Sequence, residues 1–208
     1  DDHAQQACAT ALDMQQKLRE LREKWTSEGD KWPEVVHKMR MRIGINTGPI
    51  TTGNMGSAVR MNYTMMGDAV NLAARLESAA KQYGVYTMIS HITYEIVKDD
   101  FETRQLDKIT VVGKSEPVII YELLEKKGDL DSETRKMLDI YQQGVDSFYA
   151  QQWDVAIEAL EESEKLEPCK EFSVGNMSPS KKLIEYCNHF KSIPPGDNWD
   201  GVIKLTSK

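Results

Sequence analysis

Apolar residues recur at helical spacing in two segments of the first 125 residues. The first segment covers residues 1–25, which open on a helix cap and run directly into an amphipathic helix. The second segment begins after Gly67, and its apolar positions predict a helix from Asp68 to about Tyr83, with Asp68 as the N-cap. Each helix therefore has an apolar face that can pack against the rest of the domain.

Strand patterns alternate with these helices through residue 125, which predicts an α+β fold. Residues 38–56 alternate around Gly48 and Pro49, a pattern that predicts two strands joined by a turn. The glycines and asparagine of residues 53–56 predict a second turn. The remaining elements are an extended segment at 58–66, a short buried strand at 84–90, a short helix at 91–97, and strands over 101–125 interrupted at Gly113 and Pro117.

The pattern becomes wholly helical after a charged linker at residues 126–132. Small residues at two positions, followed by a closing proline, resemble one tetratricopeptide unit of about 34 residues. Because one such unit cannot bury its own faces, we expect it to pack on a third helix at 178–190 or on the first domain. Residues 193–208 would form an extended strap whose Trp199 docks on an apolar surface. A plain helical hairpin without peptide binding is the favoured interpretation of a single unit. The residues of this pattern are Gly144 and Ala156, the fillers Tyr141, Phe148, Trp153 and Leu160, and Pro168.

Composition limits the possible partners. The chain has 26 Lys and Arg residues and 33 Asp and Glu residues, which gives a net charge of -7. It therefore has no overall positive electrostatic field that would attract the phosphates of nucleic acid. No apolar run approaches the roughly 20 residues of a membrane span. Three cysteines without a C-x-x-C pair indicate a reducing compartment and argue against zinc. We therefore expect a cytoplasmic chain, whose parent protein can still carry membrane anchors upstream.

Asn71 and Arg75 are the first candidate functional residues. They are four positions apart, so they share one helix face near the positive end of the helix dipole. The guanidinium of arginine is a planar fork of donors that fits phosphate, and asparagine can both donate to and accept from a ribose oxygen. On spacing alone, a solvated surface pair is the commoner interpretation.

Five motifs in order and spacing carry a family resemblance: RIGINTG (42–48), GNMGS (53–57), MNYTMMGDAVNLAARLE (61–77), ISHITYEIV (89–97) and GKSEPVIIYEL (113–123). They resemble the second half of a class III adenylyl/guanylyl cyclase catalytic domain. The tail, which ends in WDGV, looks like an extension found in many bacterial members. The resemblance implies a ferredoxin-like α+β cyclase domain at residues 1–125, truncated on its N-terminal side. The linker at 126–132 and a small all-helical, tetratricopeptide-like extension at 133–208 follow.

The resemblance also implies a site shared between two subunits. In this family a head-to-tail homodimer binds ATP or GTP, two Mg or Mn ions activate the ribose 3′-hydroxyl, and pyrophosphate leaves as the 3′,5′-cyclic nucleotide forms. Asn71 matches the residue that orients the ribose, and Arg75 matches the arginine that stabilises charge on the transferred phosphorus. Arg42 matches an arginine that contacts the terminal phosphates, and its alternative is an edge-strand arginine facing solvent. Thr64 matches the base-reading position and favours ATP over GTP, although a β-branched strand residue explains it too.

The metal-binding aspartates and base-reading lysine of the family are expected upstream of Asp1, so no metal ligand is assigned in this segment. Asp1 and Asp2 are better explained by helix capping. We therefore expect an adenylate cyclase-type phosphorus-oxygen lyase that is inactive as this segment alone. The alternative is a catalytically silent homologue that acts as a dimerisation or partner-binding module through its helical tail. Retention of Asn71 and Arg75 favours the enzyme.

Overall fold

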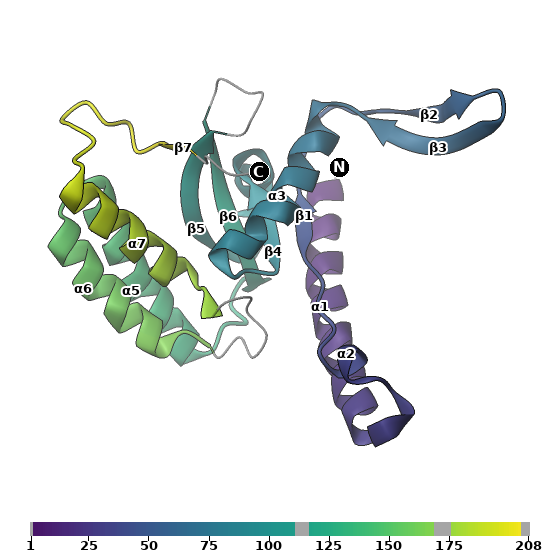
Figure 1. Cartoon of the computed structure of the whole chain (residues 1–208), viewed down its shortest axis with the longest axis horizontal. Helices are drawn as coiled ribbons and strands as arrows, with labels where there is room; N and C mark the ends of the chain where they lie inside the picture. The colour runs from purple at the N-terminus through teal and green to yellow at the C-terminus, as the bar shows by residue number, and fades with distance from the viewer. Residues whose placement is uncertain (1, 111–116, 169–175, 205–208) are drawn as a thin grey trace.

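The computed structural model describes residues 2–110, 117–168 and 176–204, with the side chain of Lys204 left out (Figure 1). Within this part of the chain, no helix is long and apolar enough to cross a bilayer. The elements are α1 (His3–Ser27), the 3-10 turn η1 (Gly29–Lys31), α2 (Glu34–His37), β1 (Ile43–Ile45), β2 (Thr51–Ser57), β3 (Arg60–Met66), α3 (Asp68–Tyr83), β4 (Thr87–Ser90), α4 (His91–Val97), β5 (Phe101–Thr110), β6 (Val118–Lys126), α5 (Ser132–Tyr149), α6 (Trp153–Leu166), α7 (Pro179–Ser192) and β7 (Ile203–Lys204).

A five-stranded mixed sheet in the order β1-β4-β6-β5-β7 forms the centre of the molecule. β1 runs parallel to β4, while β6 is antiparallel to both β4 and β5. The two strands predicted on either side of Gly48 and Pro49 are present as β1 and β2, but they do not pair with each other: β1 pairs with β4, and β2 pairs with β3 in a separate hairpin. The predicted turn at residues 53–56 is wrong, since those residues lie inside β2. Strand partners are chosen by burial against the whole sheet, which a local turn pattern does not contain.

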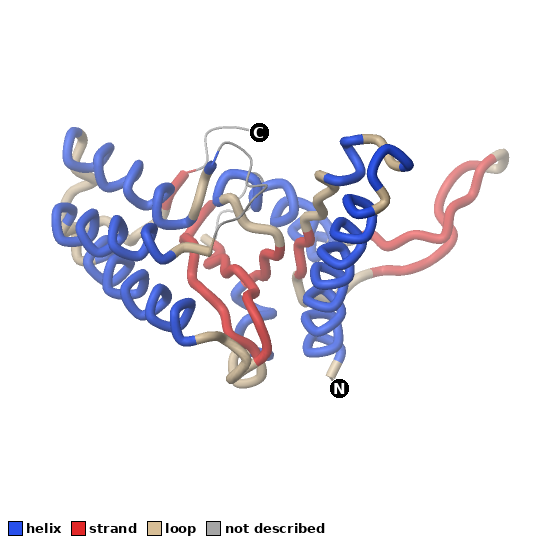
Figure 2. Tube along the Cα trace, turned by 90° about the horizontal axis from the view of Figure 1, so that it is seen from below, coloured by secondary structure: helices blue, strands red, loops and turns tan. Residues whose placement is uncertain are grey.

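The sheet separates two apolar layers, because successive residues of β4 and β6 point to opposite faces. On one face Leu76 of α3 packs with Met88 and Ile120. On the other face the buried residues of α1 pack with Ile89 and Tyr121. Figure 2 shows strands lying between α1 and the helices of the tail. The buried strand and short helix predicted at 84–97 are confirmed as β4, buried throughout, and α4.

Two glycines with positive φ bound α3. Gly67 (φ 145°) is the N-cap and Gly84 (φ 67°) is the left-handed C-cap, so the predicted helix bounds are confirmed. The prediction that Asp68 is the N-cap is wrong, because Asp68 is the first helical residue and no side-chain bond caps the helix. Its carboxylate still lies in the first turn, where negative charge complements the helix dipole.

Helices α5 and α6 form a hairpin that α7 completes. A Cβ added at Gly144 would lie 2.7 Å from Cγ of Leu160, so the helices cross where the sequence has its small residue. The predicted docking of Trp199 is confirmed, since its ring lies 5.3 Å from Phe148 and 5.1 Å from Phe190. The strap includes β7, which pairs with β5 of the central sheet. The likeness to a tetratricopeptide unit stays a prediction.

Two of the three cysteines lie in these packed layers. Cys8 of α1 and Cys187 of α7 are buried free thiols. Burial raises the pKa of Cys8 to about 11 and that of Cys187 to about 12. Both side chains therefore pack as small apolar groups. Cys169, like the predicted break at Gly113, lies outside the described residues.

Candidate active site

The first half of α3 presents Asn71 and Arg75 to solvent on one face of the helix. Leu72 and Leu76 point the other way and are buried in the sheet-facing layer. Across the described ranges, no hydrogen bond or ion pair holds the side chain of either Asn71 or Arg75. The helix thus supplies an amide and a guanidinium side by side, both available for a ligand.

The position of α3 is fixed by β1 through Gly44. A Cβ added at Gly44 would lie 2.2 Å from the carbonyl oxygen of Ala73 and 2.5 Å from the amide nitrogen of Glu77. Only glycine allows this approach of strand to helix, which places the backbone of β1 directly behind the turn that carries Arg75. An isolated glycine inside a strand pattern often marks such an approach, so Gly44 was a signal that the sequence interpretation did not use.

The start of α3 is held by the loop after β1. Asn46 donates from Nδ2 to the carbonyl oxygen of Ala69 at 3.1 Å. A Cβ on Gly48 would lie 2.9 Å from Cβ of Ala69, so this loop also lies close to the first turn of the helix. Asn46 and Gly48 belong to the RIGINTG motif but were given no individual role by the sequence interpretation. They support the helix that carries Asn71 and Arg75.

Arg42 lies just before the edge strand β1 and reaches α3. Its Nε donates to Oε1 of Glu77 at 3.0 Å, and each side chain is about one third exposed or slightly more. An ion pair with this exposure contributes little to the stability of the fold, so Arg42 can exchange Glu77 for another anionic partner at little cost. Arg42 is therefore on the same side of the fold as α3, although no described bond joins it to Asn71 or Arg75.

Thr64 is placed apart from the other three candidates. It lies on β3, opposite Gly53 of β2, with its side chain exposed. The β2–β3 hairpin projects away from the central sheet (Figure 1). One chain therefore brings Arg42, Asn71 and Arg75 to the β1–α3 unit and holds Thr64 out on the hairpin.

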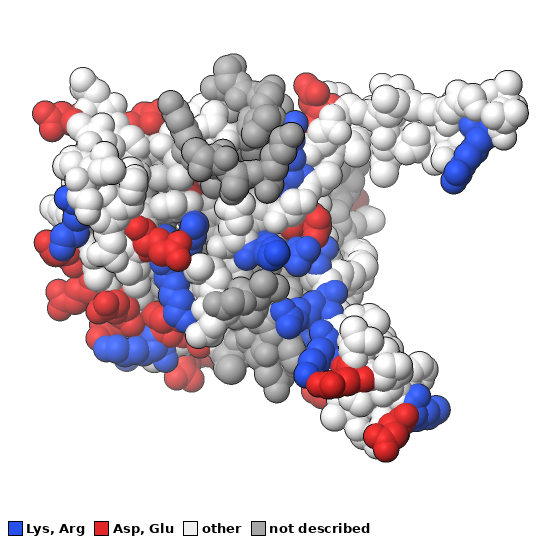
Figure 3. Space-filling view, viewed as in Figure 1, with Lys and Arg blue, Asp and Glu red and all other residues white. Residues whose placement is uncertain are grey.

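The hairpin, here called the arm (residues 51–66), exposes a large apolar surface. Val59, Tyr63 and Met61 are 96%, 75% and 63% exposed, and every residue of β3 is exposed. Arg60 is its only charged residue, and the arm is otherwise uncharged in Figure 3. An exposed apolar surface of this kind is typical of an interaction site.

The carboxylates near these residues do not form a metal centre. Among the described residues there is no group of three or more His, Cys, Asp or Glu side chains able to hold an ion. Glu77 is paired with Arg42, and Asp68 lies exposed in the first turn of α3. The described residues around α3 therefore offer no such cluster for the divalent ions that the family resemblance implies.

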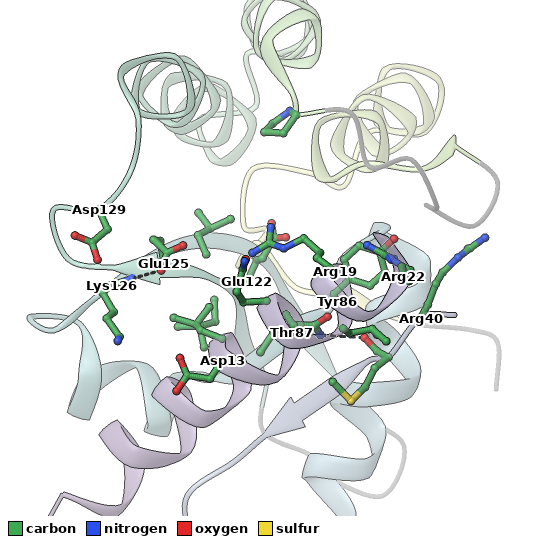
Figure 4. A pocket seen from close by; sticks show the side chains of 18 residues that line it. Asp13, Arg19, Arg22, Arg40, Tyr86, Thr87, Glu122, Glu125, Lys126 and Asp129 are labelled. Carbon is green, nitrogen blue, oxygen red and sulfur yellow. Dashed lines mark hydrogen bonds between the residues drawn. The ribbon is translucent and has the colours of Figure 1, made fainter. Parts of the chain in front are cut away.

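A separate cavity of about 630 Å³ lies between α1 and β6, and none of the four candidates lines it (Figure 4). Arg19, Arg22 and Arg40 gather around Tyr86, while Asp13, Glu125, Lys126 and Asp129 lie away from them. Burial raises the pKa of Tyr86, and the positive charges of Arg40 and Arg22 oppose that shift. The cavity is distinct from the α3 surface.

Comparison with known proteins identifies the family. The model of the adenylate and guanylate cyclase catalytic domain matches residues 1–125. The terminal-differentiation specific adenylate cyclase of Dictyostelium discoideum is 36% identical over 149 residues, which are 70% of this chain and 7% of that protein. Adenylate cyclase 1 of Rhizobium meliloti is 34% identical over 122 residues, which are 59% of this chain and 17% of that protein. The adenylyl cyclase CyaB from P. aeruginosa is 39% identical, with 58% of each chain covered and a TM-score of 0.46.

The chain therefore belongs to the family of adenylate and guanylate cyclase catalytic domains. Its α+β core with a mixed sheet is the part that carries the family motifs. The chain spans only a small part of the length of the two curated relatives named above.

Proposed function

We propose that the chain contributes Asn71, Arg75, Arg42 and Thr64 to a cyclase site that converts ATP, in preference to GTP, into the 3′,5′-cyclic nucleotide and pyrophosphate. The observation that carries this proposal is the pair Asn71 and Arg75, exposed and without described partners on a helix fixed by Gly44. Family membership and the adenylate cyclases among the relatives support the reaction class.

The roles of the two helix residues follow from their chemistry. Asn71 would hold the ribose, so that the 3′-hydroxyl faces the α-phosphate. Arg75 would donate to the equatorial oxygens of that phosphate, where negative charge grows as the bond to pyrophosphate breaks. A fixed donor aimed at charge that develops in the transition state lowers the barrier more than it strengthens substrate binding.

The remaining two residues fit a site shared with a second copy of the chain. The arm offers the apolar surface for that copy, and Arg42 would release Glu77 to contact the terminal phosphates across the interface. The hydroxyl of Thr64 can accept from the adenine amino group, and it can also donate to the guanine carbonyl. The preference for ATP therefore rests on the resemblance and on the adenylate cyclase relatives.

Divalent ions remain part of the proposal without a site among the described residues. The resemblance places the carboxylates that hold these ions upstream of Asp1. The protein that carries this chain is therefore the form in which turnover is tested.

The test is cyclic nucleotide formation by that protein, with ATP and with GTP in the presence of Mn²⁺. The expected result is cyclic AMP formation that falls a hundredfold or more in Arg75→Ala, since loss of such a donor costs about 2.7–4 kcal/mol. Lys81→Ala, which removes an exposed cation from the last turn of the same helix, is the control and keeps wild-type turnover. A folded, dimeric protein that forms no product from either nucleotide would support the silent homologue instead.

A further inference from the structure

A buried polar layer joins the sheet of the cyclase domain to the helical tail. Arg104 of β5 has a side chain only 1% exposed, and it donates to both carboxylate oxygens of Glu167 at 2.7 and 2.8 Å. Its Nε also donates to Glu122 of β6 at 3.0 Å. The guanidinium lies over the ring of Tyr141 on α5, 5.0 Å from its centroid. A fully paired buried arginine fixes the tail to one place on the sheet.

A second polar contact joins the tail to the end of α3. Tyr83, the last residue of α3, donates its hydroxyl to Oδ2 of Asp107 at 2.7 Å. Asp107 lies on β5 and is fully buried. Tyr186 of α7 is partly buried, and its hydroxyl lies close enough to Tyr83 and Asp107 to interact electrostatically with both. Three elements that are distant in sequence therefore meet at one carboxylate.

A backbone contact adjoins this group. A Cβ added at Gly84 would lie 2.0 Å from the carbonyl oxygen of Met177, two residues before α7 begins. Figure 1 shows the start of α7 near the end of α3. Gly84 is therefore restricted twice, by its left-handed conformation and by the backbone that approaches it.

We propose that α7 is a positioning element for α3, acting through Tyr186 and the Gly84–Met177 contact to set where Asn71 and Arg75 lie. The proposal rests on the proposed function for its catalytic consequence only. A helix is stiff along its axis, and Arg75 lies eight residues, about 12 Å, from Tyr83. Gly44 contacts α3 near its middle, so a shift or rotation of the C-terminal end of α3 also moves its first turns.

The mechanical part is tested by amide hydrogen exchange on Tyr186→Phe. The expected result is exchange faster by about two- to thirtyfold across α3, including residues 68–76 at the far end of the helix. Tyr149→Phe is the matched control. Tyr149 is a half-buried tyrosine of the tail whose hydroxyl accepts a hydrogen bond from Nε2 of Gln105 on β5 at 3.2 Å. This variant is expected to leave hydrogen exchange in α3 unchanged. Equal exchange of α3 in the two variants, or a change confined to residues near 84, would overturn the proposal.

The catalytic part is tested by kinetics in the protein that carries this chain. Tyr186→Phe is expected to lower kcat by about two- to thirtyfold with KM for ATP within about twofold, while Tyr149→Phe keeps both. In an Arg75→Ala background the effect of Tyr186→Phe shrinks, because the displaced group is gone. A fully additive loss would contradict positioning. If the wild-type protein is inactive on both nucleotides, the proposed function fails, and hydrogen exchange still decides the link from tail to helix.

Discussion

Gly44 of β1 and Ala73 of α3 are in closer contact than any side chain would permit, since a Cβ on Gly44 would lie 2.2 Å from the carbonyl oxygen of Ala73. The strand backbone and the helix backbone therefore touch directly. The helix that carries Asn71 and Arg75 takes its position from this contact, from the loop at Asn46, and from the tail at Gly84.

Gly44→Ala is expected to destabilise the chain by about 1–3 kcal/mol, because the added methyl pushes α3 away from β1. Urea unfolding followed by circular dichroism measures the change. Gly53→Ala on the arm is the control, since nothing lies within 4 Å of a Cβ there. Equal unfolding midpoints for the two variants would show that α3 is not held by this contact.

Glu167→Ala is expected to lower the free energy of unfolding by about 3 kcal/mol. The substitution removes one of the two carboxylates, Glu122 and Glu167, that form ion pairs with the buried guanidinium of Arg104. The control is Glu162→Ala, which removes an exposed pair with Lys165 and changes stability by less than about 0.5 kcal/mol. Chemical unfolding of both variants separates them. A small effect in both would mean that water reaches Arg104 when the carboxylate is removed.

Asp107 predicts a pH dependence of stability. Burial raises its pKa to about 6, although the bonds from Tyr83 and the Lys108 amide favour the charged form. The folded state therefore binds this proton more tightly than the unfolded state, whose carboxyl has the ordinary pKa of about 3.9. The contribution is fully present below that value and is lost as pH rises through about 6.

Asp107→Asn is thus expected to flatten the fall in stability between about pH 4 and 6, as measured by urea unfolding across that range. Asp139→Asn, at an exposed position of α5, is the control and keeps the wild-type dependence. An unchanged slope in Asp107→Asn would show that this carboxyl does not titrate in that window.

The double substitution Tyr63→Ser and Met65→Ser is expected to weaken self-association of the chain at least about tenfold, because both exposed side chains lie on the arm. Analytical ultracentrifugation over a concentration series measures the dissociation constant. Met14→Ser, which removes an exposed methionine from α1, serves as the control. A wild-type chain that stays monomeric at high concentration would refute the arm as the contact for a second copy.

The sequence by itself determined the local elements and the candidate residues. Periodic apolar positions gave the bounds of α3 correctly, and the sequence also predicted the short helix α4 and a buried strand that contains β4. These features depend on residues that are close in the sequence, so they can be predicted from the sequence alone. The placement of Asn71 and Arg75 on one exposed face follows from the same periodicity.

Only the tertiary structure decided which elements meet. β1 pairs with β4, and Arg104 pairs with Glu167, a residue 63 positions further along the chain. An alternating pattern indicates which face of a strand is apolar, but it is compatible with several different neighbouring strands in the sheet. A charged residue in a strand likewise gives no sign that it will be buried, because burial of a charge depends on partners from distant segments. The joining of the tail to α3 at Asp107 was therefore set by the packed fold.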